Sequence, residues 1–551
     1  MKNQEQTRKP VRWYFSRIPT LKIAFPSHPR HPGIVLVDLP LHGYESFMTT
    51  KLLLGLLLAT VANSIAEPRY ARIFTDHAVL QRDANVLVWG FDADPKVPLQ
   101  LRFGAITANA GIEPDGSWTA ELPPMPASQT GRNLELLQGE TVVAALRDIL
   151  VGDVWLGAGQ SNMQFVVRGM LKGLPEAQRW ADSATKPTIR IRRIDAPVLE
   201  SRTRESRDLP KADPWMAMTP ESVPNFSAVL AVFARQLNDE LAVPIGIIDT
   251  SWGGKPIEPF IPREAFESPL LSPIRDLADR DQLDELAKHR GGVIIRNPEG
   301  HPGAIFNARI RPVIPYALKG FLWYQAESNA GKGEDPRNYR HKMEALASGW
   351  RNRWAHPDLP FYFVQLPSYP NATGWIRVRE EQRRSLSIPH SGMAVTIDIR
   401  GEGIHPPNKV AVGERLAALA LADINDTPSG TGSGPIYAGH HIVGWEVRVR
   451  FREVGQALFI GDKPGFGPPE KTPDEPLRWF ELAGADGVWK PAEARIEGNE
   501  VVVLCHEIPL PVAVRYACTT EPQGGNLYNA AGLPASPFCS DLELLPWQDH
   551  Q

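Results

Sequence analysis

The stretch "DILVGDVWLGAGQSNM", residues 148–163, decides the fold of the chain. Its apolar residues run on without alternation and end in glycines, and polar residues follow at once. A run of this kind predicts a strand that is buried on both faces of a parallel sheet. The serine of this stretch, Ser161, would then lie just past the carboxyl end of a strand, where open parallel sheets collect their functional groups.

The same unit recurs further along the chain. Apolar runs that predict buried strands alternate with segments of helical periodicity. The predicted strands are residues 243–250, 319–325, 360–366 and 392–399, and the predicted helices are residues 226–241, 338–354 and 408–425. This alternation predicts an α/β domain of three layers, α/β/α, over residues 148–430.

Short alternating runs separated by turn residues lie on both sides of this domain. They predict an N-terminal β domain over residues 67–147 and a C-terminal, sandwich-like β domain over residues 435–551. A segment rich in Gly, Ser and Pro, residues 426–435, separates the last of these from the α/β domain.

Residues 48–66, "MTTKLLLGLLLATVANSIA", have the pattern of a secretory signal peptide. A lysine precedes an apolar run that is too short to span a membrane, and small residues close the segment. We interpret Met48 as the true start and residues 1–47 as a spurious extension, with a genuine tail before a membrane anchor as the alternative. The mature chain is expected to be periplasmic or extracellular, with no attachment to the membrane after the signal is removed.

The composition excludes several classes of protein. The chain has 551 residues with a net charge of −4, so no strong field points to nucleic acid. Its three cysteines match no zinc spacing, and at most one pair can form a disulfide. Zincin, Walker and dinucleotide-binding motifs are missing, and no metal or other cofactor is implied. The composition leaves the oligomeric state open.

The polar residues that follow the predicted strands form a chemically coherent set. In chain order they are Ser161, the pair Gly253-Gly254, Asn329, and Glu402 with His405. A serine hydroxyl becomes a nucleophile when a neutral imidazole removes its proton. Glycine N–H groups and an asparagine amide supply donors for a tetrahedral oxyanion, and a carboxylate beside the histidine fixes its tautomer. These are the parts of an acyl-transfer site.

The set also resembles the four blocks of the SGNH hydrolases, and the surrounding sequence resembles the sialate O-acetylesterase family within them. The resemblance extends from about residue 71 to residue 545. The stretches that carry it are "FTDHAVLQRDANVLVWG", "DVWLGAGQSNM", "FSAVLAVFARQL" with "VPIGIIDTSWGGKPIEPF", "FNARIRPVIPYALKGFLWYQAESNA", "DIRGEGIHPPNK" and "NLYNAAGLPASPF". It implies a flavodoxin-like α/β/α core and a serine carboxylic-ester hydrolase.

The resemblance also assigns roles to residues. Ser161 falls on the nucleophile and His405 on the base, while the oxyanion donors fall on the Ser161 N–H, an N–H of Gly253 or Gly254, and the Asn329 amide. Two positions depart from the family pattern. Ala326 stands where the family usually has glycine, and "EGIH" replaces the usual aspartate before the histidine. The orienting acid is therefore expected to be Glu402, with Asp398, or a Ser-His dyad without a carboxylate, as alternatives.

Four further residues are expected to support the site or to bind substrate: Gln160, Gln325, Glu327 and Trp252. The sequence thus predicts an exported esterase that removes O-acetyl groups from carbohydrates, without a cofactor. The expected substrates are 9-O-acetylated sialic acid or an acetylated plant hemicellulose such as xyloglucan or xylan. A catalytically inactive carbohydrate-binding protein on the same scaffold is the alternative from another class, and an esterase for non-sugar acyl groups is a third.

Overall fold

The structure is a computed structural model that divides into two units, Met1–Ile65 and Ala66–Gln551. It describes residues 20–26, 34–40, 67–183, 185–198, 204–280, 298–331, 335–370, 374–399, 403–426 and 432–547, with the single residues 282, 285 and 401. In the first unit, β1 (Thr20–Pro26) pairs with β2 (Ile34–Pro40) as an antiparallel hairpin. The predicted signal peptide, residues 48–66, lies outside the described residues.

The second unit is built around a long strand, β11 (Thr141–Gly159). Its first half pairs antiparallel with β10 (Ser128–Gln138), and its second half pairs parallel with β14 (Ile245–Asp249) and β15 (Gly320–Tyr324). The second half is completely buried, as expected of a strand with both faces covered. One strand therefore belongs to both the N-terminal β region and the parallel sheet, and it crosses the predicted boundary at residues 147–148.

The parallel sheet has the order β12-β14-β11-β15-β16-β17, with β13 antiparallel at one edge. The strands not yet given are β12 (Lys186–Arg193), β13 (Met216–Met218), β16 (Phe361–Val364) and β17 (Ser391–Ala394). The predicted strands thus form, and they are all parallel.

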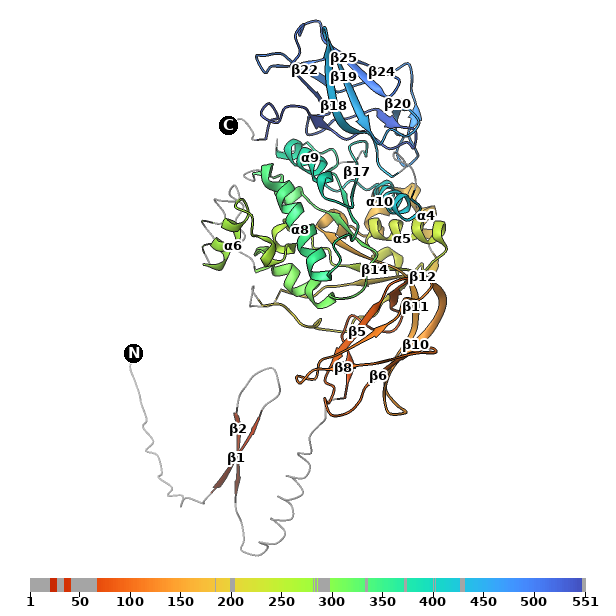
Figure 1. Ribbon diagram of the computed structural model, residues 1–551, viewed down its shortest axis with the longest axis vertical. Helices are drawn as coiled ribbons and strands as arrows, with labels where there is room; N and C mark the ends of the chain where they lie inside the picture. Colours follow the sequence, from red (N-terminus) through yellow and green to blue (C-terminus); the bar gives the residue numbers. More distant parts are fainter. Residues whose placement is uncertain are drawn as a thin grey trace, which may run out of the picture. The chain divides into compact units, whose positions relative to one another are not determined.

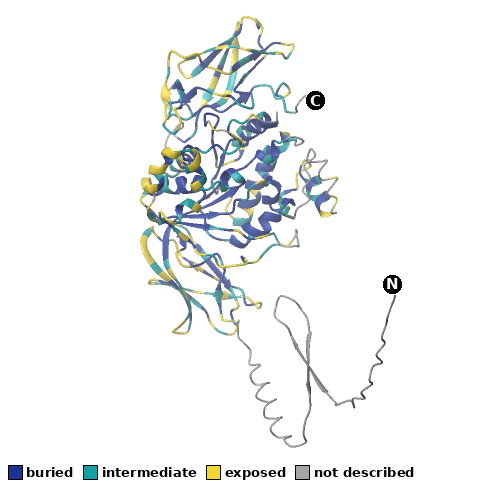
Figure 2. Cartoon of the chain, turned by 180° about the vertical axis from the view of Figure 1, so that it is seen from behind, coloured by how far each residue is buried: buried dark blue, intermediate teal, exposed yellow. Residues whose placement is uncertain are grey.

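Helices pack on both faces of this sheet (Figure 1). Alternate residues of β15 enter two different apolar cores: Phe321 and Trp323 enter one, and Leu322 and Tyr324 the other. The first core holds α8 (Tyr339–Trp354) and α9 (Gly374–Arg384), and the second holds α5 (Ala228–Leu241) and α10 (Lys409–Ile424). Figure 2 shows these sheet and helix segments as mostly buried.

The helix starts follow from local capping chemistry. The Ser227 side chain accepts a hydrogen bond from the Leu230 N–H at the start of α5, and Asn408 does the same for Ala411 at the start of α10. Shorter helices complete the α/β region: α2 (Ser161–Gln164), α3 (Val167–Gly173), α4 (Gln178–Asp182) and α6 (Ser272–Asp279).

The flanking regions are made of β-strands. The N-terminal ones are β3 (Arg69–Tyr70), β4 (Val79–Gln81), β5 (Val86–Phe91), β6 (Gln100–Phe103), β7 (Ile106–Asn109), β8 (Gly111–Ile112) and β9 (Trp118–Leu122). The C-terminal ones are β18 (Ile436–Val443), β19 (Glu446–Arg452), β20 (Leu458–Asp462), β21 (Glu470–Lys471), β22 (Phe480–Ala483), β23 (Trp489–Pro491), β24 (Glu493–Glu497), β25 (Glu500–Leu504), β26 (Ala513–Tyr516), β27 (Leu527–Asn529) and β28 (Phe538–Cys539).

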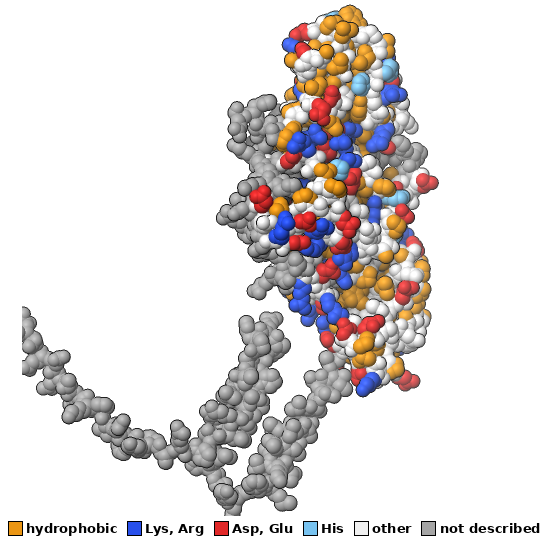
Figure 3. Space-filling view, turned by 60° about the vertical axis from the view of Figure 1, so that its left-hand side comes forward, with side chains coloured by type: hydrophobic (Ala, Val, Ile, Leu, Met, Phe, Trp, Pro, Cys, Tyr) orange, Lys and Arg blue, Asp and Glu red, His pale blue; other side chains and the backbone are white. Residues whose placement is uncertain are grey.

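The surface is mixed in charge. On the face shown in Figure 3, basic and acidic side chains are interspersed. No helix in the described part of the chain combines the length and apolarity needed to cross a membrane. The cysteines Cys505, Cys518 and Cys539 are all buried and carry free thiols.

Candidate active site

Ser161 and His405 are in direct contact. The Ser161 Oγ lies 2.7 Å from the His405 Nε2, although the two residues are far apart in the chain. Ser161 is the first residue of α2, directly after the carboxyl end of β11. The turn between them uses Gly159, which has φ +136° and packs so tightly that an added Cβ would lie 2.1 Å from the Tyr324 carbonyl oxygen. The sharp exit from the strand therefore requires glycine.

The His405 imidazole is half-buried and stacks against the Phe165 ring, with 6.1 Å between ring centroids. Burial lowers the pKa of His405, and the positive charge of Lys409 lowers it further. The neutral form of the imidazole, which can take a proton from the serine hydroxyl, thus extends to lower pH than in a free histidine.

The sequence offers two carboxylates, Glu402 and Asp398, as the acid that orients His405. Glu402 lies outside the described residues. Asp398 forms two hydrogen bonds to the Arg415 guanidinium, at 2.7 and 2.6 Å, and a longer one of 3.4 Å from the Tyr528 hydroxyl. The carboxylate of Asp398 is thus committed to a buried ion pair with α10.

The two glycines after β14 lie beside the serine. A Cβ added at Gly253 would lie 3.5 Å from the Ser161 Cβ, so this turn passes close to the nucleophile. The Gly253 N–H donates to the Gln164 side-chain oxygen at 2.9 Å. Gly254 is exposed and adopts φ +69°. The Gly253 N–H therefore donates to an oxygen that lies close to Ser161, here that of the Gln164 side chain.

Asn329 is almost fully buried, and its amide orientation is fixed by four hydrogen bonds. Its Oδ1 accepts from the Ile257 N–H at 3.0 Å and from Gln325 Nε2 at 2.9 Å. Its Nδ2 faces the Glu258 carboxylate at 3.2 and 3.4 Å, and Glu258 pairs with the Lys342 ammonium at 2.8 Å. Oxygen and nitrogen therefore each face a matching partner, which fixes the direction in which the amide points.

The expected supporting residues link the loops to each other. Gln160 Oε1 accepts from Gln325 Nε2 at 3.0 Å and from the Ser328 N–H at 3.1 Å. Glu327 is buried and accepts from Asn162 and from the Ala326 N–H, and burial raises its pKa. These bonds join the loop after β11 to the loop after β15.

Trp252 is half-buried, and the Arg309 guanidinium stacks 3.7 Å from its ring centroid. The Arg309 group is itself buried and donates to the Ser251 carbonyl oxygen. One face of the indole is therefore used by a cation–π contact within the protein.

Sequence reasoning missed Asn162, Lys409, Glu258 and Gln164. Asn162 and Lys409 are bonded to each other directly beneath the serine and histidine. The available signal was the position of Lys409, four residues after His405 at the start of a predicted helix, because it places a cation near the base. Glu258 gave no such signal, since a lone glutamate after a proline-containing loop usually lies at the surface.

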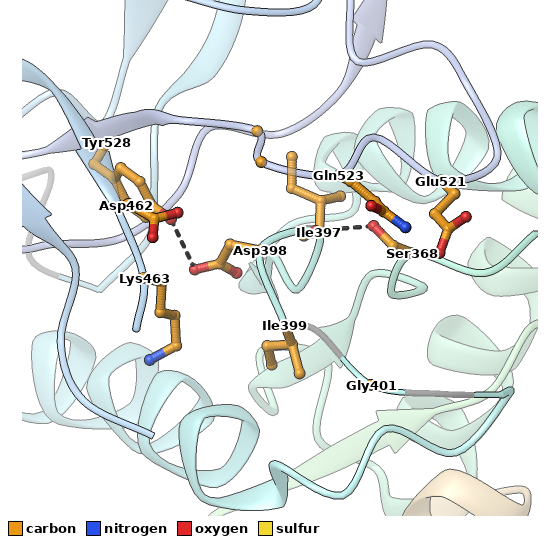
Figure 4. A pocket seen from close by; sticks show the side chains of 12 residues that line it. Ser368, Ile397, Asp398, Ile399, Gly401, Asp462, Lys463, Glu521, Gln523 and Tyr528 are labelled. Atoms are coloured by element: carbon orange, nitrogen blue, oxygen red, sulfur yellow. Dashed lines mark hydrogen bonds between the residues drawn. The ribbon is translucent and has the colours of Figure 1, made fainter. Parts of the chain in front are cut away.

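A cavity of about 520 Å³ opens beside His405, lined also by Phe165, Asp398 and Lys463. A smaller cavity of about 150 Å³ shares Asp398 and Lys463 with it. Figure 4 shows the smaller one, with Lys463 and Tyr528 from the C-terminal strands on one side of Asp398. Among the described residues, no group of three or more His, Cys, Asp or Glu side chains is placed to hold a metal ion.

Comparisons with known proteins find carbohydrate esterases. Residues 291–422 match the family model of a carbohydrate esterase, the sialic acid-specific acetylesterase. The chain is 28% identical over 556 residues to the sialate O-acetylesterase of Rattus norvegicus, which covers 89% of this chain and 98% of that protein. It is 27% identical to the Homo sapiens sialate O-acetylesterase, over 85% of this chain and 92% of that protein.

A solved structure gives the same answer for the fold. A carbohydrate acetylesterase from Xanthomonas citri superposes with a TM-score of 0.73 at 29% identity, covering 86% of this chain and all of that one. The sequence likeness, the family match and the superposition agree with one another: the chain is an esterase that is similar to the sialate O-acetylesterases and to a carbohydrate acetylesterase.

Proposed function

We propose that the protein hydrolyses O-acetyl esters on carbohydrates through an acetyl-enzyme formed on Ser161. The observation that carries the proposal is the 2.7 Å contact between Ser161 Oγ and His405 Nε2. His405 takes the hydroxyl proton as Ser161 Oγ attacks the acetyl carbonyl carbon. The protonated imidazole then gives this proton to the sugar oxygen, which leaves. Water, deprotonated by His405, then attacks the acetyl carbonyl carbon; the bond to Ser161 Oγ breaks, acetate leaves, and the protonated imidazole returns the proton to Oγ.

The oxyanion is assigned to three donors. The Ser161 N–H is at the first position of α2, where a backbone N–H has no acceptor within the helix. The Gly253 N–H joins it when the substrate oxygen replaces the Gln164 oxygen, and Gly254 is the neighbouring candidate. The Asn329 side-chain amide, whose Nδ2 now faces the Glu258 carboxylate, is the third donor. Glu402 is proposed to orient His405, and Gln160, Gln325 and Glu327 to hold the loops.

The core is proposed to be a three-layer α/β/α core of the SGNH type, flanked by β-rich domains over residues 67–147 and 435–551. The strand order β14-β11-β15-β16-β17 supports this assignment, as do the helices on both faces of the sheet. Export through the segment 48–66 is part of the proposal, and its support is the sequence pattern of that segment.

The substrate is proposed to be an O-acetylated sugar. The names of the relatives favour an O-acetylated sialic acid, which we propose to be the 9-O-acetyl ester, and the solved neighbour is described more broadly as a carbohydrate acetylesterase. Acetylated xyloglucan or xylan is the alternative. Trp252 is proposed to offer its remaining ring face to the sugar.

The test is hydrolysis of a small aryl acetate by the wild type and by Ser161→Ala. Wild-type activity that is lost in the variant supports the serine mechanism. If the wild type is no faster than the variant, the chain is an inactive carbohydrate-binding protein. Acetate release from O-acetylated sialic acids, xyloglucan and xylan then ranks the substrates.

A further inference from the structure

A buried cation close to the serine and histidine, Lys409, has no task in the mechanism described so far. Lys409 is the first residue of α10 and is completely buried. Its ammonium donates to Asn162 Oδ1 and lies 5.2 Å from the centroid of the Phe165 ring and 5.5 Å from that of Tyr324. Burying an ammonium carries a large desolvation cost, so a lysine at this position needs a reason.

The partner of this lysine connects both reacting residues. Asn162 follows the nucleophile directly in the chain, and its Nδ2 donates to the Ile404 carbonyl oxygen at 3.0 Å, next to the base. The same Nδ2 donates to Glu327 Oε1 at 2.5 Å. Both amide hydrogens and the amide oxygen of Asn162 are therefore engaged, and the loops of serine and histidine are joined through one side chain.

We propose that Lys409 is a positioning residue for the reaction, which anchors Asn162 between the loops of Ser161 and His405 and keeps the imidazole neutral by its charge. This inference rests on the proposed function, since it assigns a task within the serine–histidine pair. The Lys409 ammonium carries its charge in the pH range in which His405 is expected to take up a proton. Burial lowers the pKa of Lys409 to about 7, so its ammonium is present below that pH, in the range where a histidine of ordinary pKa about 6.5 takes up a proton.

Other charged groups near the imidazole belong to other elements. Besides burial, the Lys409 ammonium is the charge that lowers the pKa of His405. The others are Glu327 after β15, Asp398 in its ion pair with Arg415, and Lys463 after β20 at the wall of the shared cavity. Removal of the Lys409 charge is therefore expected to raise the pKa of His405, so that the base is protonated, and inactive, at a higher pH.

The experiment is the pH dependence of kcat/KM for a small aryl acetate. The acid midpoint of the wild type is expected below about 6.5. In Lys409→Met it is expected to move up toward that value. The double variant Lys409→Met with Glu327→Gln removes both buried charges, which avoids leaving an unpaired carboxylate, and is expected to show the same upward movement.

Lys342→Met is the matched control. Lys342 is also buried and paired with a glutamate, Glu258, but it acts on the Asn329 side of the site. This variant is expected to lower kcat/KM while leaving the acid midpoint at its wild-type position. If Lys409 had only a structural role, Lys409→Met would likewise lower kcat/KM and leave the acid midpoint unchanged.

Two outcomes overturn the inference: an unchanged acid midpoint in a folded Lys409 variant, or a wild-type midpoint at or above about 6.5. The second needs no variant and applies even if both variants fail to fold. Failure of the proposed function is recognised separately, because the wild type would then hydrolyse the aryl acetate no faster than Ser161→Ala.

Discussion

Replacing Asn329 by alanine tests the oxyanion site most directly. The change removes the amide that is proposed to donate to the oxyanion. The loss of one such donor typically lowers kcat by about 10²–10³-fold, which corresponds to about 3–4 kcal/mol of barrier. The change also removes the acceptor for the Ile257 N–H, whereas Gln325 can still donate to the Lys255 carbonyl oxygen at 3.3 Å. One orphaned buried donor costs about 1–3 kcal/mol of stability.

The assay must separate these two effects. Asn529→Ala is a suitable control, because the Oδ1 of Asn529 accepts from the backbone N–H groups of Ala531 and Leu533, at 3.1 and 3.0 Å. It is expected to lose at least as much stability as Asn329→Ala in denaturant unfolding, while kcat for an aryl acetate stays near the wild-type value. If folded Asn329→Ala keeps kcat within about threefold of the wild type, where 10²-fold or more is expected for a lost donor, Asn329 does not hold the oxyanion.

Three further changes have definite expected outcomes. Gly159→Ala should abolish the yield of folded protein, because the new Cβ would lie 2.1 Å from the Tyr324 carbonyl oxygen; a normal thermal unfolding midpoint would contradict this packing. Ala326 adopts φ +158°, so Ala326→Gly should unfold at or above the wild-type denaturant midpoint, and a clear loss of stability would speak against strain there. Asp398→Asn should destabilise the protein through its buried pair with Arg415, yet leave the pH profile of kcat/KM unchanged; a moved acid midpoint would favour Asp398 as the orienting acid.

Much of the α/β region was predictable because its signals are local. Unbroken apolar runs identified the buried strands, and helical periodicity identified α5 and α10. The meeting of Ser161 and His405 was predictable from the rule that strand ends share one edge of a sheet.

The helix α9 was not predicted, and its composition explains why. The segment is rich in charge, yet Arg379 and Glu381 are buried in it. The Arg379 guanidinium donates to the carbonyl oxygens of Leu366, Pro367 and Thr520, so its burial depends on partners far away in the chain. Periodicity assigns such a residue to the surface, because the partners that make its burial possible are invisible in the local sequence.

The network around Asn162 was missed for a related reason. An asparagine after a serine is typical of a turn, and only the folded chain brings the Lys409 ammonium against it. Long-range hydrogen bonds of this kind determine the surroundings of His405. The local sequence identifies the position of the histidine in the chain but not these partners.

The shared strand β11 has a consequence for how the enzyme can be dissected. Its two halves hydrogen-bond to different neighbours, and the backbone that leaves the β region is the backbone that delivers Ser161. A chain that began at residue 148 would lack β10 and the first half of β11. The remaining half of β11, which leads to Ser161, would lose its antiparallel pairing and be destabilised. Any minimal version of this esterase must therefore keep the N-terminal strands, and heat or denaturant should melt the two regions together.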